Sequence, residues 1–130
     1  MKAILIDAKL FLNGGPVSIH DLVREVVVKT NNFSTFYPHL QCSIVQPVCK
    51  LPKSADWIFV DEEGLLKTWP IVKVATPWYY SPLAGNVLIA RQGRTDVSTT
   101  VEDVKSLILN GTLSFAIVTA GDMPHTTIIV

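Results

Sequence analysis

The chain has 130 residues, of which 48% are hydrophobic and 17% charged, and its formal net charge is +0 at pH 7. A chain of this length can bury a hydrophobic core without the support of disulfides or bound metals, so we expect one domain over residues 1–130. Net neutrality gives no bulk attraction to nucleic acid or to an anionic membrane, and neither is an expected partner. The charged share is below the usual value of roughly 25%, so we expect an interface, with a homodimer as its simplest form.

The two cysteines and the N-terminal run bear on the compartment. Cys42 and Cys49 are too few for a disulfide scaffold, and seven residues apart on one extended segment they would face opposite sides of a strand. We expect reduced, buried thiols. The apolar run before Asp7 is too short for a signal peptide, and no run approaches the ~20 apolar residues of a membrane span. A cytoplasmic protein outside the membrane is expected.

The first half of the chain predicts strands around one helix. Ser18 is a favourable N-cap, and apolar residues then recur at three- and four-residue spacing, which predicts a helix over residues 19–29. The β-branched run 26–28 favours an early end of that helix. Strands are expected at residues 2–7, 9–12 and 40–48, with Pro47 marking an edge or a bulge in the last, a turn at residues 13–16 and a loop at 31–38.

Residues 54–69 read as a β-hairpin around which the rest of the chain packs. The aromatic and β-branched run 57–60 is typical of a half-buried strand. Three carboxylates and Gly64 then predict a turn, with Gly64 free to adopt a positive φ. Residues 65–67 would form the returning strand.

The second half of the chain predicts one more helix and three strands. Thr99 and Glu102 have the spacing of a capping box, apolar residues follow at helical spacing, and Gly111 stands where a C-cap is expected. Residues 69–82 contain three prolines, which predicts an irregular stretch. Strands are expected at residues 86–92, 114–119 and 126–130, with a turn at 93–96. Two helices separated by several strands indicate an α+β fold with a mainly antiparallel sheet.

The order of several short motifs resembles a family of small uncharacterised domains from bacteriophages and mobile elements. The matching pieces lie within residues 55–109, and the resemblance implies a phage-type accessory protein but no chemistry. They are Val60-Asp61-Glu62-Glu63-Gly64-Leu65, Pro70, Gly85-Asn86-Val87-Leu88-Ile89 and the helical stretch Thr99 to Leu107.

The polar residues do not form a recognisable catalytic or metal-binding motif. Asp61, Glu62 and Glu63 follow one another on a turn and point in different directions, whereas metal sites need converging carboxylates. They are interpreted as a solvated turn or as an acidic knob that grips a basic partner. The three histidines and two cysteines lack zinc-ligand spacing. We expect no catalytic residue, no metal and no cofactor.

Four aromatic residues within residues 69–82 are the most distinctive feature of the sequence. Tyr and Trp are enriched in binding hot spots, so this stretch is a candidate partner surface, and the alternative is a loop that buries its rings in the core. They are Trp69, Trp78, Tyr79 and Tyr80. Arg91 and Arg94 flank a turn and could instead clamp the phosphate or carboxylate of a small ligand, with Tyr79 or Tyr80 stacking on it.

The leading hypothesis is a non-catalytic, phage-type accessory protein that binds a host bacterial protein and modulates or inhibits it. The alternatives are an oligomer that sequesters a nucleotide-like ligand and a small hydrolase that uses the acidic cluster. For the homodimer, the apolar segment 126–130 is the expected pairing edge.

Overall fold

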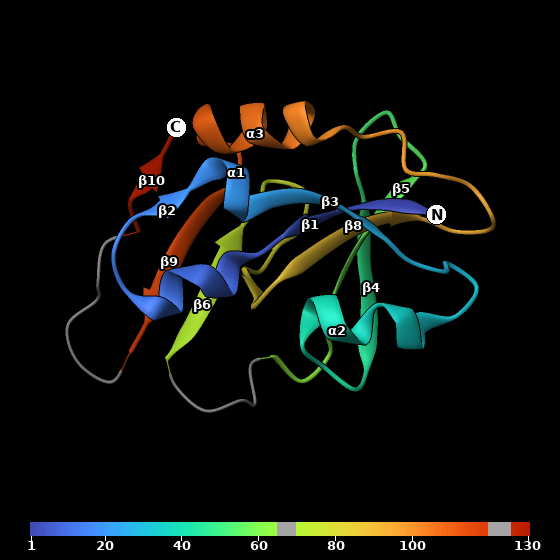
Figure 1. The fold of residues 1–130 in the computed structure, drawn as a ribbon, viewed down its shortest axis with the longest axis horizontal. Coiled ribbons are helices and arrows are strands. Elements are labelled where there is room, and N and C mark those ends of the chain that lie inside the picture. Colours follow the sequence, from blue (N-terminus) through green and yellow to red (C-terminus); the bar gives the residue numbers. More distant parts are fainter. Residues whose placement is uncertain (65–69, 120–125) are drawn as a thin grey trace.

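The computed structural model describes residues 1–64, 70–119 and 126–130. Its centre is a five-stranded sheet with the order β3-β1-β8-β5-β4, in which every neighbouring pair is antiparallel (Figure 1). This arrangement confirms the α+β class with a mainly antiparallel sheet. The strands are β1 (Lys2–Ile6), β3 (Val23–Val27), β4 (Val45–Lys50), β5 (Asp56–Asp61) and β8 (Val87–Arg91).

Two smaller sheets complete the strand framework. One has the order β7-β6-β9, and in the other β10 pairs with β2 in parallel. The strands are β2 (Val17–Ser18), β6 (Ile71–Ala75), β7 (Leu83–Ala84), β9 (Ser114–Val118) and β10 (Ile128–Ile129). The helical elements are η1 (Ala8–Asn13), α1 (Ile19–Leu22), η2 (Phe33–Thr35), α2 (Tyr37–Leu40) and α3 (Val101–Leu109).

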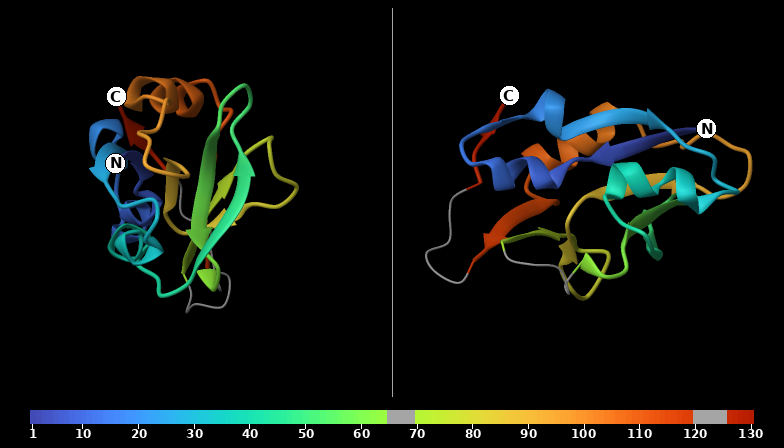
Figure 2. Two further views of the ribbon diagram at one scale, coloured as in Figure 1. Left: turned by 90° about the vertical axis from the view of Figure 1, so that its right-hand side faces the viewer. Right: turned by 60° about the horizontal axis from the view of Figure 1, so that its bottom comes forward.

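The central sheet has a hydrophobic core on each face. Successive residues of a strand point to opposite faces, so Ile4 and Ile6 enter the main core while Ala3 and Leu5 enter a smaller one. The main core also takes residues from α3, η1, β6 and β9. The smaller one is closed by Phe36, which lies between η2 and α2, and by Leu40 of α2. Figure 2 shows the ribbon of these elements from two further sides. The strand expected at residues 2–7 is present as β1, and both of its faces are covered.

The predicted helix over residues 19–29 is wrong beyond its first turn. Ser18 does cap the start, since its Oγ accepts from His20 N at 3.2 Å, but α1 ends at Leu22 and the chain continues as β3. β3 pairs along its whole length with β1. Because the β-branched residues of this segment lose χ1 freedom in a helix and pack well on a sheet, an available sheet partner decides the outcome.

Other boundaries also differ from the prediction. Residues 9–12 lie in the 3₁₀ helix η1 and not in a strand, and residues 71–75 form β6 within the stretch expected to be irregular. The expected loop 31–38 contains η2. The strand expected at residues 40–48 begins only at Val45, and Leu40 is instead the last residue of α2.

The predicted β-hairpin over residues 54–69 is also wrong, because β5 pairs with other strands. The neighbours of β5 on its two edges are β4 and β8, and the predicted returning strand, residues 65–67, lies outside the described residues. The turn itself is confirmed at Glu62 and Glu63. Pro47 lies where expected, on the outer strand β4 at a register shift.

The second long helix is confirmed, with its cap one residue later than predicted. Thr100 is the N-cap, and its Oγ1 and the Asp103 carboxylate each accept the other residue's backbone N–H at 3.1 and 2.9 Å. Gly111 follows the end of α3 with a φ of 82°, which an L side chain rarely adopts. The strands expected at 86–92 and 114–119 are present as β8 and β9.

Candidate functional site

Two of the predicted binding segments, the acidic turn and the tyrosine pair, come together in space. A hollow of about 220 Å³ lies between β4, the end of β5 and the loop that leads into β7. That loop projects beside β4 and β5 (Figure 2, left). We call the lining formed by Asp61, Glu62, Tyr79 and Tyr80 the tyrosine–acid surface.

The two tyrosines of this surface differ in exposure. Tyr79 is half-buried against the main core, whereas Tyr80 is 91% exposed. Their ring centroids are 4.6 Å apart with the planes tilted by 39°, so Tyr79 supports the ring of Tyr80. A hydrogen bond with the Tyr80 hydroxyl, assisted by desolvation and by neighbouring Cys49, raises the pKa of Tyr79. The raised pKa keeps the Tyr79 hydroxyl protonated, so that it stays a neutral hydrogen-bonding group at physiological pH.

The three carboxylates of the turn have separate roles. Asp61 is buried, and its Oδ1 accepts from Glu63 N at 2.9 Å, which fixes the turn. Glu62 N donates to Ile44 O at 3.0 Å, and its side chain extends into solvent at the hollow. Glu63 is exposed but does not line the hollow. Glu62 is thus the solvent-exposed carboxylate beside the tyrosines.

Gly64 is required for a reason that differs from the predicted positive φ. A Cβ at this position would lie 3.0 Å from Ala84 O and 3.1 Å from Ala84 Cβ, and Gly64 is not among the residues with positive φ. The turn therefore packs directly onto β7, because glycine allows two backbones to approach closely. This contact holds the acidic turn beside the tyrosine loop.

Trp78 lies apart from the tyrosine–acid surface. It packs partly buried against the main core and lines a groove of about 380 Å³ with Pro52, Thr99 and Leu107. Trp69 lies outside the described residues. The structure therefore packs Trp78 and Tyr79 partly against the core and leaves Tyr80 exposed.

Arg91 is occupied by an internal network that the sequence did not reveal. Its Nε donates to Asp56 Oδ1 at 3.0 Å, and its Nη2 donates to Ser98 Oγ at 2.8 Å. The Asp56 side chain is fully buried and also accepts from the backbone N–H and the hydroxyl of both Ser98 and Thr99, at 2.6 to 3.2 Å. This carboxylate ties β5 and β8 to the segment that enters α3.

The hydrogen bonds to Asp56 outweigh the effect of its burial. Desolvation alone would raise the pKa of this carboxyl, but the four hydrogen bonds donated by the N–H and O–H groups of Thr99 and Ser98 hold its pKa far below the usual value. Arg94 is exposed in the following turn. Because Arg91 is held by Asp56, the two arginines do not form the predicted clamp for an anionic ligand.

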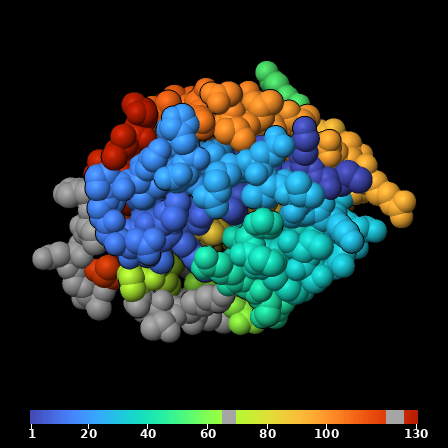
Figure 3. Space-filling model, viewed as in Figure 1, coloured from blue at the N-terminus to red at the C-terminus, as the bar shows by residue number. Residues whose placement is uncertain are grey.

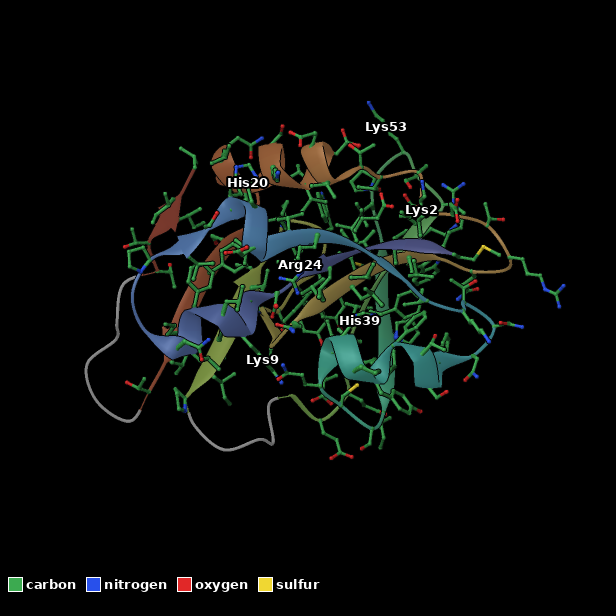
Figure 4. The ribbon with its side chains drawn as sticks, viewed as in Figure 1. Lys2, Lys9, His20, Arg24, His39 and Lys53 are labelled. Carbon is green, nitrogen blue, oxygen red and sulfur yellow. The ribbon has the colours of Figure 1, made fainter. Side chains whose placement is uncertain are left out.

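Among residues 1–64, 70–119 and 126–130, no group of three His, Cys, Asp or Glu side chains could hold a metal ion. His20, which is labelled in Figure 4, lies beside Lys105, and the Lys105 Nζ is 3.0 Å from His20 Nδ1. Cys42 and Cys49 are not joined in a disulfide, and both are partly exposed, whereas buried thiols were expected. Burial raises the pKa of Cys49.

Comparison of the chain with protein-family models, with curated proteins and with solved structures found no match. The resemblance to phage accessory domains therefore stays a prediction. No helix in the described part of the chain is long and apolar enough to cross a membrane.

Proposed function

We propose that the protein is a non-catalytic binding protein whose tyrosine–acid surface takes a basic segment of a partner protein. The observation that carries this proposal is Tyr80, an aromatic ring that is 91% exposed yet braced against Tyr79 at the edge of a hollow. Tyrosine offers a large amphipathic contact at a low cost in side-chain entropy. Pro82 limits the freedom of the loop, which lowers the entropy lost on binding.

The charges around the hollow favour a cationic partner group. Its described lining includes Asp61 and Glu62 but no lysine, arginine or histidine. The face of a tyrosine ring attracts a cation, and an exposed carboxylate beside it provides a hydrogen-bond acceptor. An arginine suits both, because its planar guanidinium stacks on aromatic rings and bonds carboxylates through two N–H groups.

The resemblance to phage-type domains leads us to propose a host bacterial protein as the partner, with modulation or inhibition as the result of binding. The nucleotide alternative is less favoured for two reasons. Arg91 is held by Asp56, and carboxylates beside the tyrosines repel phosphate. The hydrolase alternative requires converging acids, whereas the Asp61 carboxylate organises the turn through Glu63 N.

Affinity capture with matched variants tests this proposal. Immobilised wild-type protein, Tyr80→Ala and Glu62→Gln are compared with Glu102→Gln, whose side chain is 83% exposed on α3. We expect a bacterial protein that is retained by the wild type and by Glu102→Gln and is lost from the other two variants. Capture of the same proteins by all four forms would contradict the proposal, as would the absence of any specific protein.

A further inference from the structure

The outer strand β3 has a row of free backbone groups. In an antiparallel pair, alternate residues of a strand bond to the neighbour and the others direct N–H and C=O outward. Leu22 O accepts from Asp7 N at 2.7 Å and Val28 N donates to Met1 O at 2.9 Å, so the even-numbered residues of this segment face β1. The N–H and C=O of Glu25 and Val27 therefore point outward, and no described residue bonds to them.

The outer strands β4, β9 and β10 each have a feature that limits pairing with another chain. On β4, Pro47 lacks an N–H and a register shift interrupts the strand. The Phe115 carbonyl on β9 accepts from Thr126 Oγ1 at 3.1 Å, and β10, from the segment expected to be the pairing edge, is paired with β2. Proline and bulges are common protections of sheet edges, and β3 has neither. Helix α3 packs against β3, but no described residue bonds to the outward N–H and C=O groups of Glu25 and Val27.

The outer edge of β3 is open to solvent at Glu25 and Val27. Val27 is 74% exposed although it is apolar, and Figure 3 shows the light-blue segment that includes β3 uncovered beneath the orange helix α3. The Arg24 charge is drawn away from the edge, because its Nη2 bonds Asp7 Oδ2 at 2.9 Å and its Nη1 donates to Asp21 O (Figure 4). The Nζ of Lys2 lies 3.9 Å from Oε1 of Glu25 and offsets the charge of that carboxylate.

We propose that β3 pairs with β3 of a second copy of this chain, antiparallel and with Val26 on the two-fold axis. In this register Glu25 lies opposite Val27 of the second copy, and each pair exchanges two hydrogen bonds. The four outward groups of each copy are then satisfied, and the two central sheets join into one. Val26 meets its own symmetry mate, and pairs of β-branched residues are favourable between strands.

The register follows from the charges and the available donors. Centring the pair on Glu25 would place two carboxylates directly opposite each other, which is unfavourable. It would also require the Val23 N–H, which already donates to Ile19 O. The register centred on Val26 avoids both problems. A two-fold pair of identical surfaces closes the assembly as a dimer.

Charge substitutions at Val27 test both the dimer and its register. Opposite Glu25 of the second copy, Val27→Lys adds two attractive pairs and Val27→Glu adds two repulsive ones. The dimer dissociation constant should fall for Lys and rise for Glu, each on the order of tenfold. Sedimentation velocity from micromolar to near-millimolar protein measures both, with Val27→Thr as the neutral control. Val27 is exposed, so these variants are expected to fold.

Oxidative cross-linking checks the same register independently. Val26→Cys should form a disulfide-linked dimer, because a non-hydrogen-bonded pair brings the two Cα atoms within disulfide range. Val27→Cys should cross-link much less, since it faces Glu25. A monomer at every concentration for the wild type and Val27→Lys would overturn the proposal. Shifts of the same sign for Lys and Glu, or equal cross-linking of the two cysteine variants, would also overturn it.

Discussion

Replacement of Asp56 by Asn should destabilise the fold more than any surface change. The carboxylate is fully buried and receives Arg91 together with the backbone and hydroxyl groups of Ser98 and Thr99. An amide cannot accept at both positions and leaves Arg91 without its counterion. Removing one partner of a buried pair costs about 3–5 kcal/mol. Since a typical domain has about 5–15 kcal/mol of stability, this loss is a large fraction of the total.

Urea unfolding followed by tryptophan fluorescence measures this loss, with Glu102→Gln as the exposed carboxylate control. The control should change the free energy of unfolding by less than about 0.5 kcal/mol. A cost below about 1 kcal/mol for Asp56→Asn would refute the view that this network anchors the entry to α3.

The pH dependence follows from the lowered pKa of Asp56. A carboxyl whose folded-state pKa lies below its unfolded value stabilises the fold above the unfolded pKa and loses that contribution as pH falls toward the folded pKa. The stability difference between wild type and Asp56→Asn should therefore be largest near neutral pH and shrink from about pH 5 downward. A difference that stays constant to pH 3 would contradict this assignment.

Four further alanine substitutions test the assigned packing, exposure and helix capping. Trp78→Ala should lower the free energy of unfolding by about 2 kcal/mol or more, because its ring packs against the core. Tyr80→Ala should change the free energy of unfolding by less than about 0.5 kcal/mol, because its ring is exposed. Equal effects of the two variants in thermal melting would contradict the assigned exposures. Gly64→Ala should lower the melting temperature by forcing the turn away from Ala84, and an unchanged value would show that the contact yields easily. Thr100→Ala should cost about 1 kcal/mol in urea unfolding through loss of the helix cap, and Ser at this position should restore most of it.

The sequence predicted those elements whose local preference agrees with their packing. The strand at β8 and the helix at α3 have apolar residues at the period of their structures, and α3 has a cap and a terminal glycine. In β3 the signals conflicted: Ser18 correctly marked a helix start, but the valines that follow suit a sheet. The partner strand β1 decides between them, and no local pattern contains that information.

The candidate site was predicted only in its parts. An exposed tyrosine pair and an acidic turn are recognisable as motifs, but their proximity depends on the fold that brings the loop before β7 against the end of β5. Asp56 was missed because its partners Ser98 and Thr99 lie more than forty positions away in the chain. A carboxylate at the start of an apolar strand was the available signal, and it does not identify a partner.

Titration calorimetry with the captured partner tests the central claim most directly. The partner is titrated against wild type, Tyr80→Ala, Glu62→Gln and Glu102→Gln, with thermal melting of each protein alone. We predict that Tyr80→Ala weakens binding by at least about thirtyfold, as a hot-spot residue does, and that Glu62→Gln weakens it less and reduces its salt dependence. Melting temperatures should stay nearly unchanged. Equal affinity of all four proteins would contradict binding at the tyrosine–acid surface.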